Sequence, residues 1–226
     1  MEKTDSGEYA SLFACAFFAT LIMLVIIPVQ LVVFAATGIP GSIEDWFALF
    51  SANPLLGFFH ADLFILVNNI LISVMYLAFY HTLKGINKGM MQIAVMLGLI
   101  GIAAYISSNR TFELFALARE YSGTADADAR VLLATAGTAV LSGWQGTAFD
   151  AYYVLNGVTL LIVSIIMFRS PLFGKATAAW GLSSGILMMI PSTAGTVGLV
   201  FSVLSLIPWY VFAVRFAFVF RKLSAR

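Results

Sequence analysis

Charged residues are scarce in this sequence of 226 residues. Only 10% of the residues are Asp, Glu, Lys or Arg, whereas 61% are hydrophobic, and the mean hydropathy is +0.97. Soluble globular proteins carry about 25% charged and roughly 45–50% apolar residues. The shortage of charge therefore excludes an ordinary soluble domain and predicts an integral membrane protein.

Basic runs, cysteine pairs and metal-ligand motifs are also missing. The net charge is +1, and no stretch is rich enough in Lys or Arg to bind a phosphate backbone, so we expect no nucleic-acid partner. The one cysteine, Cys15, has no second cysteine with which to form a disulfide, and no Cys/His spacing typical of a metal site occurs. We therefore expect no metal and no cofactor.

Long apolar runs dominate the sequence instead. A helix that crosses the hydrocarbon needs about 20 largely apolar residues, because the helix satisfies its own backbone amides where no water is present. Six runs fit, of which the fifth is short: residues 10–37, 61–83, 90–108, 148–168, 176–190 and 196–220. The sequence therefore predicts an all-α, polytopic transmembrane helical bundle of six spans, forming a single domain over residues 1–226.

The placement of Lys and Arg orients this predicted bundle. The loops 84–88 and 169–175 and the tail from Arg215 carry eight Lys/Arg and no Asp or Glu, so the positive-inside rule puts all three in the cytoplasm. An even number of spans must then separate the two loops, and a seventh candidate at 131–145 does not cross. We expect residues 109–147 to form an extracytoplasmic helical hairpin that extends spans three and four, and both termini to be cytoplasmic.

Polar side chains interrupt the apolar run that begins at residue 61. At 100° per residue, one helical face would carry Asp62, Asn69, Ser73, Tyr76 and Tyr80. An ionised carboxylate within a membrane costs several kcal/mol unless it is paired, hydrated or protonated, so Asp62 is a candidate functional residue. The alternative is that the hydrogen bonds of this face only pack neighbouring helices.

Asp150 enters the fourth span from the same outer end as Asp62. If spans two and four are adjacent, one outward-opening cavity can be lined by His60, Asp62, Asn69, Tyr76, Asp150, Tyr153 and Asn156. Such a cavity suits a small ligand, an ion or a lipid in a sensor or carrier subunit. Alternatively, Asp62 and Asp150 pair with arginines of the hairpin in a structural lock, the candidates being Arg110, Arg119 and Arg130.

A serine motif raises the possibility of an enzyme. Residues 181–185 (Gly-Leu-Ser-Ser-Gly) match the G-x-S-x-G string, and His60 stands nine residues before Asn69. These features resemble rhomboid intramembrane proteases, in which a His/His/Asn set supports the oxyanion and a histidine on a later helix is the base. Here Ile65 replaces the middle histidine and no histidine follows His81, so the serine lacks a base. We expect a non-enzymatic protein, with an intramembrane hydrolase as an alternative.

Helix-boundary residues in the C-terminal third carry a family resemblance. They are residues 169–175 (Arg-Ser-Pro-Leu-Phe-Gly-Lys), 180–182 (Trp-Gly-Leu), Pro191, 195–199 (Gly-Thr-Val-Gly-Leu) and 208–209 (Pro-Trp). Together with the overall plan of spans and loops, they resemble a bacterial family of polytopic membrane proteins with a domain of unknown function. The resemblance implies a bacterial cytoplasmic membrane protein of six spans and no catalytic residue. Membrane lipid is an expected partner, and a partner protein or a second copy of the chain stays open.

Overall fold

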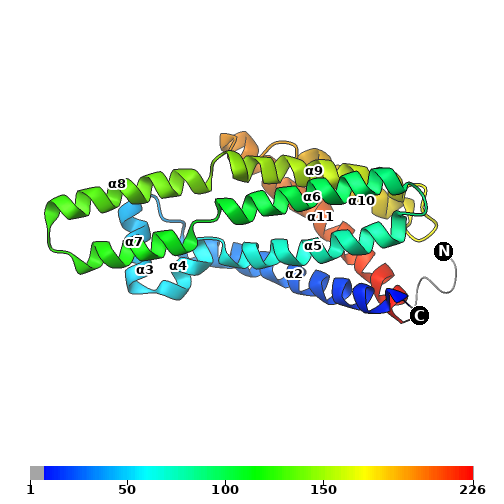
Figure 1. The fold of residues 1–226 in the computed structure, drawn as a ribbon, viewed down its shortest axis with the longest axis horizontal. Coiled ribbons are helices and arrows are strands. Elements are labelled where there is room, and N and C mark those ends of the chain that lie inside the picture. The colour runs from blue at the N-terminus through cyan, green and yellow to red at the C-terminus, as the bar shows by residue number, and fades with distance from the viewer. Residues whose placement is uncertain (1–7, 226) are drawn as a thin grey trace. The chain divides into compact units, whose positions relative to one another are not determined.

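The computed structural model describes residues 8–225, and all the regular elements in that part of the chain are helices. In chain order they are α2 (Ala10–Thr37), α3 (Ile43–Ala52), α4 (Pro54–His60), α5 (Leu63–Leu83), α6 (Lys88–Ser108), α7 (Thr111–Gly123), α8 (Ala127–Trp144), α9 (Thr147–Met167), α10 (Lys175–Leu187) and α11 (Gly195–Ser224) (Figure 1). The all-helical fold class is confirmed.

Within residues 8–225, five stretches of helix are long and apolar enough to cross a membrane. They are Ala10–Thr37, Leu63–Leu83, Lys88–Gly123, Ala127–Met167 and Gly195–Ser224. The fifth predicted span, at 176–190, corresponds to α10, which has 13 residues. At 1.5 Å per residue it measures about 20 Å, less than the roughly 30 Å of a hydrocarbon core. The apolar helices support a protein embedded in a membrane.

The chain divides into two compact units. Unit 1 comprises Met1–Val25, Asn68–Ala104 and Asp150–Arg226, and unit 2 comprises Ile26–Val67 and Tyr105–Phe149. Helices α2, α5, α6 and α9 each contribute residues to both units. The candidate site residues are therefore described unit by unit.

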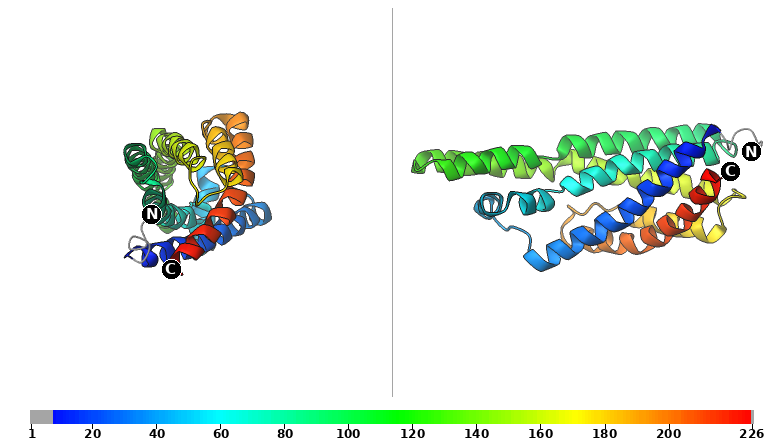
Figure 2. Two further views of the ribbon diagram at one scale, coloured as in Figure 1. Left: turned by 90° about the vertical axis from the view of Figure 1, so that its right-hand side faces the viewer. Right: turned by 90° about the horizontal axis from the view of Figure 1, so that it is seen from below.

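Unit 1 is held together by aromatic packing and by hydrogen bonds between helices. The ring of Phe79 on α5 lies 5.0–6.2 Å from four other phenylalanine rings, those of Phe173, Phe212, Phe216 and Phe220. The Thr159 hydroxyl of α9 donates to the carbonyl of Ala94 on α6 at 3.0 Å. Helices α10 and α11 pack against each other, as the gold and orange-to-red helices of Figure 2 show.

Unit 2 has its own aromatic core around α3. This helix starts with a capping box, in which Ser42 accepts from the Asp45 amide and Asp45 accepts from the Ser42 amide. Its buried face packs on α7 and α8 in a cluster formed by Ile43, Trp46, Phe47, Phe50, Ala61, Leu114, Ala118 and Trp144. Tryptophans commonly mark membrane interfaces, but Trp46 and Trp144 are 3% and 5% exposed and belong to this core.

Candidate functional site

Asp62 occupies the turn between α4 and α5 and has a left-handed backbone. Its φ is 61°, the one positive φ among the described residues other than glycine. A left-handed residue after a helix end is usually Gly, and Asp is among the few others that tolerate the conformation. The carbonyl of Asp62 accepts the first bond of α5 from Leu66 at 2.9 Å. Asp62 is therefore not in helical register with Asn69 and Tyr76, which corrects the predicted single stripe.

The carboxylate of Asp62 is bonded to a glutamine from α2. Gln30 Nε2 donates to Asp62 Oδ1 at 2.5 Å, and the Gln30 side chain is buried. Burial raises the pKa of Asp62 from its ordinary 3.8 to about 7, while hydrogen bonds from Gln30 and Tyr105 oppose that increase. Asp62 lies just before the apolar helix α5. With a pKa of about 7, its carboxyl group gains or loses its charge on small changes of pH near neutrality.

His60, at the end of α4, is bonded to the same face of α2. Its Nε2 lies 2.8 Å from Thr37 Oγ1, and the Thr37 hydroxyl also donates to the Val33 carbonyl at 2.7 Å. Because that hydroxyl hydrogen is used, His60 Nε2 carries the hydrogen donated to Thr37, and Nδ1 is an acceptor. Burial lowers the pKa of His60, which favours this neutral form.

Two buried acceptors next to Asp62 have no hydrogen-bond donor within residues 8–225. They are Gln30 Oε1 and His60 Nδ1, on side chains that are 4% and 2% exposed. A buried acceptor left without a donor costs about 1–3 kcal/mol, and native proteins contain few of them. A molecule that supplies an N–H donor or a positive charge can satisfy an acceptor of this kind, and Gln30 Oε1 belongs to the side chain that bonds to the Asp62 carboxylate.

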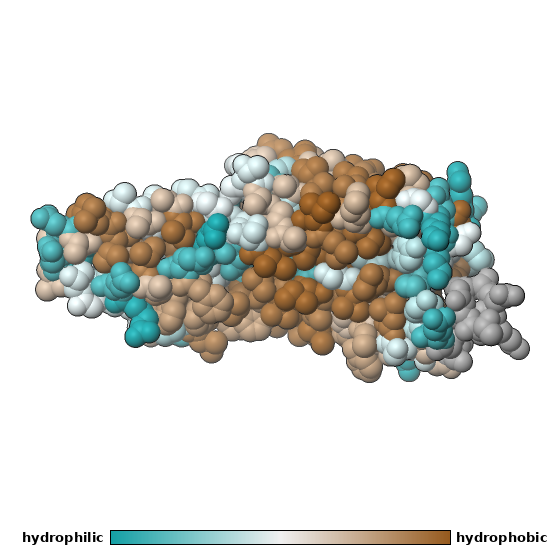
Figure 3. Space-filling model, in the orientation of Figure 1, coloured by the Kyte–Doolittle hydropathy of each residue, from teal (hydrophilic) through white to brown (hydrophobic). Residues whose placement is uncertain are grey.

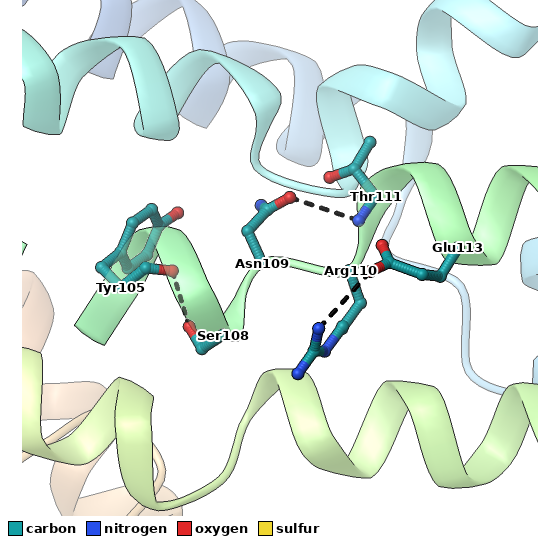
Figure 4. Close-up of polar contacts among 6 residues, drawn as sticks. All are labelled: Tyr105, Ser108, Asn109, Arg110, Thr111 and Glu113. Carbon is teal, nitrogen blue, oxygen red and sulfur yellow. Dashed lines mark hydrogen bonds and ion pairs between the residues drawn. The ribbon is translucent and has the colours of Figure 1, made fainter. Parts of the chain in front are cut away.

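The backbone of the same turn is held by the link between α6 and α7. The Ala61 carbonyl accepts from Asn109 Nδ2 at 3.1 Å and from the Thr111 hydroxyl. Figure 4 shows Asn109 turned toward Thr111, whose amide donates to Asn109 Oδ1 at 3.2 Å. Side chains of α2 and of the α6–α7 link thus fix the turn from outside the α4–α5 segment.

The arginines of unit 2 do not pair with Asp62. Arg110 bonds to Glu113 at 3.4 Å (Figure 4), and Arg130 donates to the Thr124 carbonyl at 2.9 Å. Arg119 lies over the Phe115 ring at 5.9 Å. The structural lock by hairpin arginines is therefore not found for Asp62 among the residues described.

The other five predicted site residues belong to unit 1, where they form separate contacts. Tyr76 on α5 donates to Asn156 on α9, and Asn156 Nδ2 donates to the Tyr152 carbonyl at 2.9 Å. Tyr153 donates to Ser202 at 2.6 Å, and Asp150 accepts from Thr193. Asn69 is fully buried. Tyr76 and Asn156 are thus brought together, whereas Asp150 contacts the link between α10 and α11 and Tyr153 contacts α11.

The predicted cavity shared by Asp62 and Asp150 stays a prediction. His60 and Asp62 lie in unit 2, and Asn69, Tyr76, Asp150, Tyr153 and Asn156 lie in unit 1. In each unit the aspartate accepts from a neutral side chain of its own unit, Gln30 or Thr193.

The serines of the G-x-S-x-G string bond to helix carbonyls. Ser183 donates to the Ala179 carbonyl at 3.0 Å, and the buried Ser184 donates to the Ser205 carbonyl on α11 at 3.1 Å. In unit 1 the histidine is His81, which is 3.3 Å from Lys84 Nζ and stacks on Tyr9. These contacts are those of packed helices.

Three residues around Asp62 did not enter the predicted site: Gln30, Thr37 and Tyr105. Gln30 is the one amide side chain in the first apolar run, and Thr37 follows it by seven residues, two helical turns, on the same face. That spacing was available in the sequence. The partner of this face was not, because it depends on how α2 packs.

Comparison with known proteins finds a family match. A protein-family model described as "Domain of unknown function (DUF4386)" matches residues 14–225. No curated protein and no solved structure matches the chain.

Proposed function

The chain belongs to the DUF4386 family, whose description assigns no activity, and from that premise we propose a non-enzymatic membrane protein that binds a small ligand at Asp62. In this proposal it is a sensor or carrier subunit of a bacterial cytoplasmic membrane. The ligand reaches the turn between α4 and α5 from the outer side.

The proposed topology has six spans with both termini in the cytoplasm. Five long apolar helices support it, and the short helix α10 is added to them as the fifth crossing in chain order. The eight Lys/Arg of the loops 84–88 and 169–175 and of the C-terminal tail supply the positive-inside argument. Helices α7 and α8 then form an extracytoplasmic hairpin that extends spans three and four.

The single observation that carries the proposal is the set of acceptors at the turn. The Asp62 carboxylate, Gln30 Oε1 and His60 Nδ1 are all hydrogen-bond acceptors, and the last two have no donor in the described chain. Acceptors of this kind suit a small cation or a protonated amine rather than an anion. The left-handed φ at Asp62 is the type of local strain that often accompanies functional sites.

Thermal unfolding of the purified protein in detergent tests this function. Ammonium, methylammonium, sodium and potassium salts serve as probes, with tetraethylammonium at equal ionic strength as the salt control. We expect at least one probe to raise the Tm of the wild type and not that of Asp62→Asn, because binding to the folded state stabilises it. If every probe acts equally on both proteins, the ligand site is absent.

A structural or interaction subunit is the second candidate. It is favoured by the bonds that Gln30, Asn109 and Thr111 donate to the turn and by the bond between His60 and Thr37, which together hold the turn in place. In this case the membrane protein serves a partner protein or a second copy of itself. Asp62→Asn combined with Asp150→Asn discriminates the two, since loss of folding alone supports the structural role and a folded protein with an altered phenotype supports ligand binding.

A further inference from the structure

A partly open groove lies in unit 1 beside the turn from α5 to α6. Its volume is about 180 Å³, far above the roughly 10–15 Å³ that one water molecule needs. Most of its lining is apolar, from Ile86, Met90, Ile162, Ile165 and Ile166. These side chains offer no hydrogen bonds to water, so the groove suits a hydrocarbon chain.

Two polar side chains complete the lining of this groove. Arg169 follows the C-terminus of α9, is exposed, and has no side-chain hydrogen bond or ion pair with any other described residue. Asn87 accepts from the Met90 amide through Oδ1 at 3.1 Å, which leaves its side-chain NH₂ as a donor. The groove thus joins an apolar lining to a guanidinium and an amide donor.

The surrounding charge is of one sign. The loops 84–88 and 169–175 contain Lys84, Lys88, Arg169 and Lys175 and no Asp or Glu. In Figure 3 hydrophilic side chains gather at the end of unit 1 where these loops lie, and the surface over α5, α6 and α9 beside them is hydrophobic. A ligand that fits both regions has an apolar chain and an anionic head.

We propose that the groove binds an anionic glycerophospholipid, with one acyl chain along the isoleucines and the phosphate on Arg169 and Asn87. The planar guanidinium matches phosphate oxygens in a bidentate geometry, and basic pockets between cytoplasmic helix ends hold anionic headgroups. This site is independent of the Asp62 turn. Its assignment to the inner leaflet rests on the topology under Proposed function.

Lipid binding to the delipidated protein in detergent, followed by native mass spectrometry, tests the proposal. The probes are phosphatidylglycerol, phosphatidylcholine with the same acyl chains, and free glycerol 3-phosphate. We expect phosphatidylglycerol to bind more tightly than phosphatidylcholine and free glycerol phosphate to bind negligibly. Arg169→Gln should weaken phosphatidylglycerol binding about tenfold to a hundredfold, the range for loss of a hydrogen bond to a charged group.

Matched variants separate this site from a general surface charge. Lys175→Gln removes a charge from the same loop but not from the groove, so it should change affinity little, and Arg169→Lys should restore part of it. Ile165→Trp should lower the affinity for both lipids by filling the groove. Arg169 and Ile165 are exposed, the latter 54%, so we expect both variants to keep the wild-type Tm.

Three results would overturn the proposal. Equal losses in Arg169→Gln and Lys175→Gln would indicate a diffuse charge effect. Equal binding of free glycerol phosphate and of phosphatidylglycerol would indicate an anion site that needs no lipid. Unchanged lipid binding in Ile165→Trp would place the acyl chain outside this groove.

Discussion

At the scale of single residues, Asp62 combines a strained backbone with a partly buried carboxyl group. The left-handed region costs an ordinary L residue roughly 1–2 kcal/mol, and Asp62 adopts it with φ 61°. Its carboxylate relies on Gln30 for a hydrogen bond. The contributions of the backbone and of the side chain to stability can be measured separately, because different substitutions affect each one.

The backbone contribution is tested with three substitutions of Asp62. Asp62→Asn keeps a side chain that tolerates the left-handed region, whereas Asp62→Ala does not. We expect the free energy of unfolding of the alanine variant to be about 1–2 kcal/mol lower than that of the asparagine variant. The measurement is denaturant titration in detergent. Asp62→Gly is the control, because glycine adopts φ 61° freely. An alanine variant as stable as the asparagine variant would contradict the strain.

The raised pKa of Asp62 predicts a pH dependence of stability. The carboxyl titrates near 3.8 in the unfolded chain and at about 7 in the folded one, so between these values the folded state holds a proton that the unfolded state has released. Stability is therefore lost as the pH rises from about 4 to 7, at up to roughly 1.4 kcal/mol per pH unit. The measurement is the free energy of unfolding against pH.

Asp62→Asn is the comparison for that measurement, because it lacks the titrating group. His60 faces the same turn, and its lowered pKa gives the opposite sign, with stability lost as the pH falls below its ordinary 6.5. This contribution is common to both proteins and cancels in the difference. Parallel curves for wild type and Asp62→Asn would rule out the raised pKa.

At the scale of helices, unit 1 depends on close approach between α5, α6 and α9. A Cβ at Gly98 on α6 would overlap the Tyr76 ring of α5, and one at Gly101 would overlap the Asn156 amide of α9. Small residues of this kind allow membrane helices to pack closely. The hydrogen bond from Tyr76 on α5 to Asn156 on α9 joins the same two side chains that Gly98 and Gly101 approach.

Gly98→Ala therefore tests the packing of α6 on α5. We expect it to lower the free energy of unfolding by about 1–3 kcal/mol, the usual cost of overpacking a close contact. Gly143→Ala on α8 is the matched control, since nothing lies within 4 Å of its added Cβ, and alanine there should be neutral or stabilising by up to about 1 kcal/mol. Equal effects of the two substitutions would argue against the contact.

The bond between Tyr76 and Asn156 is tested by a double-mutant cycle. Tyr76→Phe, Asn156→Ala and the double variant should give a coupling energy near the ~0.6 kcal/mol that is typical within membranes, and at most about 1.7 kcal/mol. The readout is unfolding in detergent. A coupling of zero would mean that the two side chains are independent.

At the scale of the whole molecule, the proposed arrangement in the membrane rests on the apolar helices and the basic loops. Gly123 lies at the end of α7, and Gly174 lies just before α10. In the proposed six-span topology these two positions lie on opposite sides of the membrane.

Cysteine labelling checks this topology in a Cys15→Ala background. A membrane-impermeant reagent applied to intact cells should label Gly123→Cys within minutes and leave Gly174→Cys unlabelled until the membrane is opened. The unsubstituted Cys15→Ala protein gives the background. Labelling of both positions from one side would invalidate the even number of crossings between the two basic loops.

The helices were largely predictable from the sequence, because each depends on local patterns. The predicted span at 90–108 corresponds to α6, and that at 148–168 to α9, within two residues at each end. The start of the second span was wrong by two residues, because the left-handed Asp62 delays α5 until Leu63.

The sequence by itself determined that this protein is helical and membrane-embedded, since long apolar runs must satisfy their backbone amides within a helix. The tertiary structure alone decided which polar groups meet. Asp62 bonds to Gln30, 32 positions away, and Tyr76 to Asn156, 80 positions away. Such pairs depend on helix packing and on one backbone angle at a turn, and neither is encoded in local hydrophobic periodicity.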